Sequence, residues 1–329
     1  MYDKIVNFVK NKIKRLLSKI KDAYKAFLQV VLKKEILPEA VYIEPTNICN
    51  ANCIFCAYQY YDAPKEVMKI EMLEMILKEM KEMKIKKINL TPFAGEIFTD
   101  KSIMDKLELI EKYNFESVTT YTNLLNLHKI NIDKLLSCGL TNIHISASPL
   151  SKELYKKIYR SSQYDKFLNN LVSFLNNFNN KQDKKVKEIR IEFRSNMPLE
   201  QCLELPDYKN KIAPLVHGNI QVGAMQVFDS WMGVIKKDDL LEGMTIAKPN
   251  GKKLIPCGRL NHIQVLSNGD MRVCGCRFNN ESEKDIFYIG NIKNISIKDA
   301  YNSQIVKDIK RSFILRNPPV ECQKCSWYS

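Results

Sequence analysis

The chain has 329 residues, of which 45% are hydrophobic, and it contains only 11 glycines and 12 prolines. This composition excludes a collagen-like or wholly disordered chain and is sufficient for a sizeable core in one large or two moderate domains. Residues 1–40 carry ten of the 51 basic and four of the 37 acidic residues, a net charge of +6 out of +14 for the chain.

Several classes of protein are excluded by these features. No run of about 18 uncharged apolar residues is present, so no membrane-spanning helix is predicted. The lysine-rich N-terminus has no apolar signal-peptide core, which predicts a cytoplasmic protein. Aromatic residues are not interleaved with the basic ones, so we expect no nucleic-acid partner.

Residues 4–34 have the pattern of an amphipathic helix that ends before Pro38, and we treat residues 1–38 as a helical extension. Apolar residues recur every three or four positions with lysines between them, which forms one apolar stripe. The stripe comprises Ile5, Phe8, Val9, Ile13, Leu16, Leu17, Ile20, Tyr24, Phe27, Leu28, Val31 and Leu32. It can pack on the body of the protein, or it can lie on a membrane surface or a partner.

Residues 39–235 alternate short β-rich runs with helical ones. Strands are predicted near residues 41–44, 87–92, 117–122, 141–147, 187–195 and 219–227, and helices most clearly at 66–83, 100–112, 129–138 and 151–178. Six βα units in series predict an α/β fold with a parallel sheet, either open or curled towards a barrel.

The strand near 187–195 separates polar from apolar residues. Arg190, Glu192 and Arg194 share one face, while the intervening residues are apolar. Since buried parallel strands are usually apolar on both faces, polar side chains on one face indicate a ligand-filled interior that contains the active site. The alternative is an edge strand that faces solvent.

Residues 236–329 form a smaller module. A hairpin is predicted around Asn268–Gly269, followed by a helix near 297–313 and a short cysteine-bearing tail. Four cysteines lie in two separated pairs, and four thiolates can hold either a zinc ion or an iron–sulfur cluster. These are Cys257, Cys274, Cys322 and Cys325.

The loop after the first predicted strand contains Cys49, Cys53 and Cys56 in C-x3-C-x2-C spacing. Disulfides are disfavoured in the cytoplasm, so this spacing indicates metal binding or catalysis. Three thiolates can hold three irons of a [4Fe–4S] cluster and leave the fourth iron open, whereas a structural zinc needs a fourth ligand that is not nearby.

These motifs resemble the radical S-adenosylmethionine (SAM) superfamily from about residue 40 to the end of the chain. The resemblance rests on the three cysteines, on Phe55 before the third of them, on TPFAGE at residues 91–96, and on Ser146 and Arg194 at the ends of the fourth and fifth strands. It implies a partial (β/α)6 TIM-like barrel and a cluster that chelates SAM. Phe55, Gly95, Glu96, Ser146 and Arg194 would bind SAM, although Ala94 stands where a glycine is commoner in the family.

The C-terminal module resembles a twitch module, which is a shortened SPASM domain. The resemblance implies that Cys257, Cys274, Cys322 and Cys325 ligate one auxiliary [4Fe–4S] cluster. Cys276, two residues beyond a ligand, is a candidate hydrogen-atom donor, while Cys138 and Cys202 are expected to be structural.

The twitch enzymes that this chain resembles act on aminocyclitols and aminosugars, so the resemblance implies a radical SAM oxidoreductase. A small polar substrate would be oxidised by hydrogen abstraction, with the auxiliary cluster as electron acceptor and Glu192 or Arg190 as base. Trp231 and Arg259 would lie near the substrate. An acidic flavodoxin or ferredoxin would suit the basic surface as reductant.

Three alternatives remain open at this point. The first is an epimerase in which Cys276 returns a hydrogen atom to the substrate. The second is a peptide-modifying SPASM enzyme, although residues 1–38 leave no room for a peptide-recognition domain. The third is a thiolate-zinc protein that docks on a partner through its basic helix.

Overall fold

The computed structural model describes residues 2–93, 95–249, 253–275 and 285–326, and only the backbone of residues 2–5, 7, 8, 11 and 15. Six strands pair in parallel in the order of the sequence and form one continuous sheet. They are β1 (Ala40–Ile43), β2 (Lys87–Leu90), β3 (Ser117–Thr122), β4 (Asn142–Ala147), β5 (Glu188–Arg194) and β6 (Ile220–Met225).

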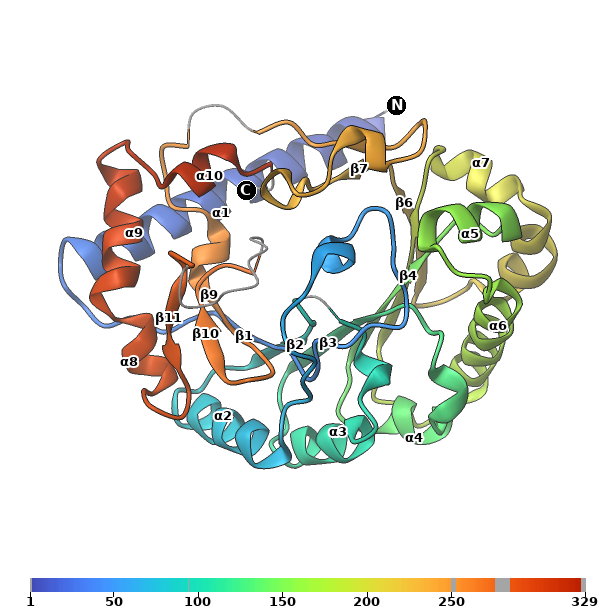
Figure 1. Cartoon of the computed structure of the whole chain (residues 1–329), viewed down its shortest axis with the longest axis horizontal. Coiled ribbons are helices and arrows are strands. Elements are labelled where there is room, and N and C mark those ends of the chain that lie inside the picture. Colours follow the sequence, from blue (N-terminus) through green and yellow to red (C-terminus); the bar gives the residue numbers. More distant parts are fainter. Residues whose placement is uncertain (1, 94, 250–252, 276–284, 327–329) are drawn as a thin grey trace.

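Helices cover the outer face of this curved sheet (Figure 1). They are α2 (Ile70–Glu82), α3 (Ile103–Lys112), α4 (Ile132–Ser137), α5 (Lys152–Tyr159), α6 (Tyr164–Asn180) and α7 (Leu199–Glu204). The helix expected at 151–178 is two helices, because Arg160 at the end of α5 has a left-handed backbone (φ 49°) that an α-helix cannot continue. The α/β barrel-like fold is confirmed.

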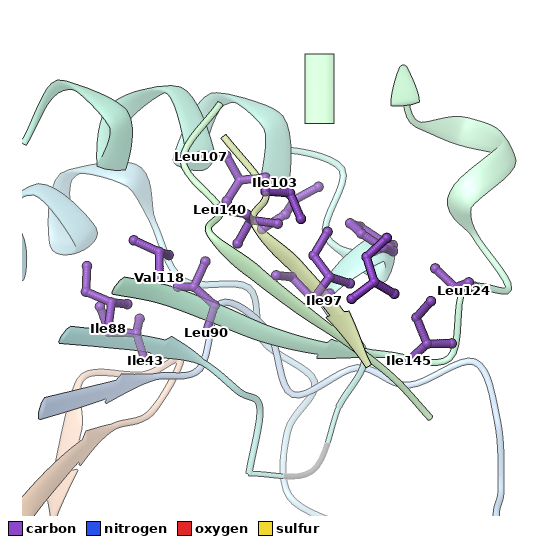
Figure 2. Packing of buried hydrophobic residues seen from close by; sticks show 14 of the residues in the cluster. Ile43, Ile88, Leu90, Ile97, Ile103, Leu107, Val118, Leu124, Leu140 and Ile145 are labelled. Carbon is purple, nitrogen blue, oxygen red and sulfur yellow. The ribbon is translucent and has the colours of Figure 1, made fainter. Parts of the chain in front are cut away.

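The apolar faces of the strands pack beneath the helices. Figure 2 shows Ile88 and Leu90 of β2 and Val118 of β3 pointing to the side on which Ile103 and Leu107 of α3 lie, and all five are buried. On β5 every second residue is buried, and the polar residues between them are only partly buried. Because β5 lies between β4 and β6, the solvent-facing edge is excluded and its polar face lines the interior.

The C-terminal hairpin continues the same sheet. Its strands are β9 (His262–Val265) and β10 (Asp270–Arg272), joined around Asn268–Gly269 as predicted, and β11 (Tyr288–Asn291) pairs with β10. Gly269 has φ +96°, a conformation that favours glycine. Strand β9 pairs in parallel with β1, which gives a nine-stranded order β11-β10-β9-β1-β2-β3-β4-β5-β6.

The remaining elements surround this sheet. A two-stranded sheet of β7 (Val227–Phe228) and β8 (Thr245–Ile246) follows β6, and the helix expected near 297–313 is the pair α8 (Ile297–Tyr301) and α9 (Gln304–Ile314), followed by α10 (Val320–Lys324). The domain boundaries that we place between residues 38 and 39 and between residues 235 and 236 stay predictions.

The N-terminal helix α1 (Tyr2–Val30) packs against α9. Its predicted apolar stripe does not face the body, because side chains from Val9 to Phe27 on that stripe are 44–60% exposed. Of the two interpretations of the stripe, the structure therefore matches the one in which it is available to an outside surface. Among the described residues, no helix combines the length and apolarity needed to cross a membrane.

Candidate active site

The loop that leaves β1 carries Cys49, Cys53 and Cys56 and is held by two tyrosines. The backbone N–H of Cys49 donates to the Tyr58 hydroxyl at 3.0 Å, and the Cys56 Sγ accepts from the N–H of Tyr58 at 3.4 Å. The rings of Tyr58 and Tyr61 stack, with their centroids 6.1 Å apart. These contacts hold the cysteine-bearing backbone in one conformation.

The three thiols are close enough to interact electrostatically. Burial raises the pKa of Cys53 well above its ordinary value, and the thiols of Cys56 and Cys49 raise it further. Burial and the charge of Glu96 raise the pKa of Cys49 to about 12. Thiolates in such a dry position need a cationic partner, since the ionised form is otherwise disfavoured.

A cavity of about 480 Å³ opens beside this loop, inside the curve of the sheet. Three of the predicted SAM-binding residues, Phe55, Ser146 and Arg194, line it together with Cys56. Arg194 Nε donates to Ser146 Oγ at 3.2 Å, and the guanidinium lies 6.0 Å from the centre of the Phe55 ring. Burial raises the pKa of Cys56, while the N–H of Tyr58 and the positive charge of Arg194 oppose this shift, so Arg194 lies close to the thiol.

Gly95 and Glu96, which we also predicted to bind SAM, are not among the residues that line the cavity. The Glu96 carboxylate is buried and accepts from Thr122 Oγ1 at 2.5 Å and from the backbone N–H of Asn123 at 2.7 Å. Burial raises its pKa to about 7. The side chain therefore ties the TPFAGE segment to the end of β3. The charge of Glu96 also raises the pKa of Cys49.

Glu192 lies in the cavity wall between two guanidinium groups. Its Oε1 is 3.3 Å from Arg190 Nη2 and its Oε2 is 3.0 Å from Arg194 Nη1. Arg190 contacts this carboxylate but is not itself among the residues that line the cavity. Trp231 and Arg259 both line the cavity, and Trp231 Nε1 donates to the carbonyl of Phe55 at 3.2 Å.

Several lining residues were missed by our sequence analysis. Tyr42, Tyr121, Asp229, His262 and Gln264 all line the cavity. Alternation on the first and third strands, which places Tyr42 and Tyr121 on the polar face, was a usable signal. The residues of β9 had no such signal, because nothing in the sequence indicates that β9 pairs with β1.

The four C-terminal cysteines are brought close enough together for their thiols to interact. Burial raises the pKa of Cys322 strongly, and the thiols of Cys274, Cys257 and Cys325 raise it further. Buried Lys253 donates to the carbonyl of Cys325 at 2.6 Å and to that of Cys322. Gly275, adjacent to Cys274, lines the same cavity as Cys56.

The other cysteines divide into two cases. Cys138 and Cys202 are buried outside the cavity lining, in agreement with a structural role. Cys276, the proposed hydrogen-atom donor, lies outside the described residues.

The two sets of cysteines fit iron–sulfur clusters by the number and kind of their donor atoms. The thiols of Cys49, Cys53 and Cys56 interact with one another, and so do those of Cys257, Cys274, Cys322 and Cys325. Three thiolates would leave one iron of a cubane open, whereas four can hold a complete cubane.

The cavity also offers polar atoms to a ligand. Thr91 Oγ1 and His262 Nδ1 are buried and have no hydrogen-bond partner within the part of the chain that the structure describes. Since buried polar groups are normally paired, these atoms favour a bound polar molecule such as SAM or a substrate.

Comparison with protein families agrees with this geometry. The model of the radical SAM superfamily matches residues 43–183, and the SPASM model, an iron-sulfur cluster-binding domain, matches residues 257–326. The chain contains a radical SAM domain followed by a SPASM iron-sulfur domain. These radical SAM and SPASM domains imply [4Fe–4S] clusters, and several solved structures with this fold contain SAM.

Curated relatives match about two fifths of the chain. A probable GTP 3',8-cyclase of Methanocaldococcus jannaschii is 28% identical over 130 residues, which are 39% of this chain and 43% of that protein. The corresponding protein of Archaeoglobus fulgidus is 27% identical over 129 residues, 39% of this chain and 42% of its own length. The match thus spans less than half the length of these relatives.

Solved structures match almost the whole chain. Streptococcus suis SuiB bound to precursor peptide SuiA has a TM-score of 0.62 at 17% identity and covers 93% of this chain and 74% of its own. BtrN in complex with AdoMet and 2-DOIA has a TM-score of 0.52 at 13% identity, with 89% and 94% covered. AnSMEcpe with bound AdoMet has 0.54 at 16%, with 88% and 87% covered. At these identities the likeness shows the fold.

A first prediction concerns Gly95, where a Cβ would lie 2.5 Å from the carbonyl oxygen of Thr46 and 3.1 Å from Asn47 Cα. Gly95→Ala must therefore displace the TPFAGE segment from the cysteine loop. We expect SAM affinity, measured by equilibrium dialysis under anaerobic conditions, to fall at least tenfold. Gly223→Ala is the control, because its Cβ would meet only the Arg190 side chain at an ordinary 3.6 Å. Equal affinities of the two variants would contradict the prediction.

A second prediction concerns His262, whose pKa is lowered to about 4 by burial and by the charge of Arg259. The unfolded chain binds a proton near the ordinary value of about 6.5, so stability is lost as pH falls from there. Between pH 7 and 5 this loss is about 2 kcal/mol. His262→Gln should flatten the acid side of the urea-midpoint profile by this amount, whereas exposed His217→Gln should leave the profile unchanged.

Proposed function

We propose that this chain oxidises a small polar substrate, of the aminosugar or aminocyclitol kind, between two iron–sulfur clusters. The observation that carries the proposal is that one cavity is lined both by Cys56 and by Gly275 beside Cys274. When bound, SAM and its cluster supply a hydrogen-abstracting radical, and the auxiliary cluster supplies an electron acceptor. A substrate in this cavity would lie between the two.

The cavity wall suits a molecule rich in hydroxyl and amino groups. Tyr42, Asn89 and Gln264 offer neutral hydrogen-bonding groups, while Glu192 and Arg259 offer charges of both signs. A cavity of about 480 Å³ lies in the range typical of small-molecule sites. Phe55, Ser146 and Arg194 would take the SAM side of this space.

Oxidation of an alcohol removes one hydrogen atom, one electron and one proton, so the cavity needs a proton acceptor. We propose Asp229 for this role beside the earlier candidate Glu192. Burial raises the pKa of Asp229, while a hydrogen bond from Ser326 Oγ at 2.5 Å lowers it. A carboxylate with a raised pKa is the better base near neutral pH. The Glu192 carboxylate is engaged by two guanidinium groups that stay protonated, and Arg190 would position it.

A third prediction tests the two-cluster arrangement by iron and sulfide content after anaerobic reconstitution. We expect about eight irons per chain in the wild type, and about four in the Cys49/Cys53/Cys56→Ala variant and in the Cys257/Cys274→Ala variant, because each group would hold one cubane. The matched control Cys138→Ala/Cys202→Ala should keep about eight. A wild type with about four irons, and none left in the first variant, would overturn oxidation through an auxiliary cluster.

A fourth prediction tests the base with a panel of deuterated aminocyclitols and aminosugars. A substrate is recognised by transfer of deuterium into 5′-deoxyadenosine. With that substrate, Asp229→Asn should form product at least 100-fold more slowly, because a general base contributes about 10²–10⁴-fold. The variant should still cleave SAM.

The pH profile separates this role from a structural one. Product formation by the wild type should fall as pH drops below the pKa of Asp229, since the base must be ionised. Ser326→Ala removes the hydrogen bond that lowers this pKa, so its acid limb should move to higher pH. An unmoved acid limb, or full activity of Asp229→Asn, would argue against Asp229 and leave Glu192 as the base.

Two other activities are distinguished by the same assays. An epimerase would form an isomer of the substrate, and this product would contain solvent deuterium when the reaction is run in D2O. Cys276→Ala would then stop turnover but not SAM cleavage. The likeness to SuiB bound to its precursor peptide supports a peptide substrate as second candidate. Because curated relatives are called probable GTP 3',8-cyclases, GTP belongs in the substrate panel.

The reductant and location follow from the same proposal. Reductive cleavage of SAM needs an electron donor, and an acidic flavodoxin or ferredoxin would be attracted by the net charge of +14. Thiolate-bound clusters and reduced cysteines suit the cytoplasm. A zinc protein without enzymatic activity is disfavoured, because it would not account for the match of the radical SAM model to residues 43–183.

A further inference from the structure

Helix α1 is anchored through a face that is mostly small or polar. Asp22 accepts from Asn261 Nδ2 at 2.5 Å, and Gln29 donates to the carbonyl of Tyr301 at 2.8 Å while accepting from Lys310 Nζ at 2.7 Å. Asp22, Ala26 and Gln29 are all buried. These buried hydrogen bonds set the rotation of the helix about its own axis.

The opposite face of α1 presents a continuous apolar stripe to the outside. Successive residues of an α-helix are about 100° apart, which puts the following side chains within one arc of roughly 100°. They are Val9, Ile13, Leu16, Leu17, Ile20, Tyr24 and Phe27, with exposures of 46%, 53%, 60%, 60%, 57%, 60% and 44%. Turning this stripe inward would break the bonds of Asp22 and Gln29, so the body of the protein cannot cover it. Figure 1 shows α1 at the periphery of the molecule, outside the curved sheet.

Basic side chains flank this stripe on both sides. By the same helical spacing, exposed Lys10 and Lys14 lie along one edge and exposed Lys12 and Lys19 along the other. Residues 4–21 contain six lysines, one arginine and no acidic residue. An apolar strip between two rows of cations matches the boundary between acyl chains and anionic headgroups.

We propose that α1 docks the protein on an anionic lipid bilayer. The helix lies in the plane of the interface, with Leu16, Leu17 and Ile20 among the acyl chains and the lysines at the headgroup phosphates. It cannot span the bilayer, because no described helix is apolar and long enough. A second copy of the chain is a poor partner for the stripe, because two α1 helices packed together would bring their flanking lysines close to one another.

The test is flotation of the anaerobically reconstituted full-length protein with two kinds of vesicle, phosphatidylcholine alone and phosphatidylcholine with phosphatidylglycerol. We expect binding to the anionic vesicles that weakens with added salt, and little binding to the neutral ones. Leu16→Gln/Leu17→Gln/Ile20→Gln keeps the charge and should weaken binding at least a hundredfold.

A charge variant and a matched control complete the design. Lys10→Gln/Lys12→Gln/Lys19→Gln should weaken binding about a hundredfold at low salt, because each lysine near an anionic surface contributes about fivefold. The control Ile305→Gln/Leu315→Gln removes two exposed apolar side chains at α9 and should bind like the wild type. Circular dichroism and iron content should be unchanged in all variants.

The proposal is overturned by a wild type that does not float with anionic vesicles, or by a stripe variant that floats as well as the wild type. It is equally overturned if the free protein is a dimer that the stripe variant dissociates, because the stripe would then be covered by a second copy. Binding to neutral and anionic vesicles alike would overturn the role of the lysines. None of these outcomes depends on the substrate or on turnover.

Discussion

The parallel pairing of β9 with β1 is the constraint on which the candidate site depends. Strand β1 leads into the loop of Cys49, Cys53 and Cys56, and β9 follows Cys257 after one short helical turn, Gly258–Asn261. The two strands pair with Tyr42 opposite Gln264, and the cavity beside them is lined by Cys56 and by Gly275, the neighbour of Cys274. Without this pairing the C-terminal module would carry its thiols elsewhere, and a substrate could not lie between the two groups.

Glu44, at the end of β1, secures this junction. Its buried carboxylate accepts from the backbone N–H of Phe93 at 2.7 Å and from Ser267 Oγ at 3.0 Å, so it joins the TPFAGE segment to the hairpin. Arg272, buried in an ion pair with Asp285, lies 4.8 Å from the centre of the Phe93 ring. Barrel and hairpin therefore share buried polar contacts, and removing one partner would leave a charge unpaired in the interior.

In β5 and in α1, the face that packs against the body of the protein differs from the face that is available to a ligand or a surface. On β5 the apolar residues are fully buried under the helices, while Glu192 and Arg194 face the cavity. Helix α1 reverses the usual arrangement, since its polar Asp22 and Gln29 face the body and its apolar stripe faces outward. In both elements the side chains that are not needed for packing are the ones available to a ligand or a surface.

Local patterns in the sequence determined much of this protein. The strand and helix periods predicted the six βα units, the alternation at 189–194 predicted the polar interior, and cysteine spacing together with TPFAGE indicated the radical SAM superfamily. These signals are short-range, because each depends on neighbours within about one turn or one strand. Only the tertiary structure decided that β9 pairs with β1, that Asp229 and His262 enter the cavity, and which face of α1 is buried. The pairing of β9 with β1 and the orientation of α1 depend on contacts between residues more than 200 positions apart, such as Tyr42 with Gln264 and Asp22 with Asn261, and no local period of the chain determines them.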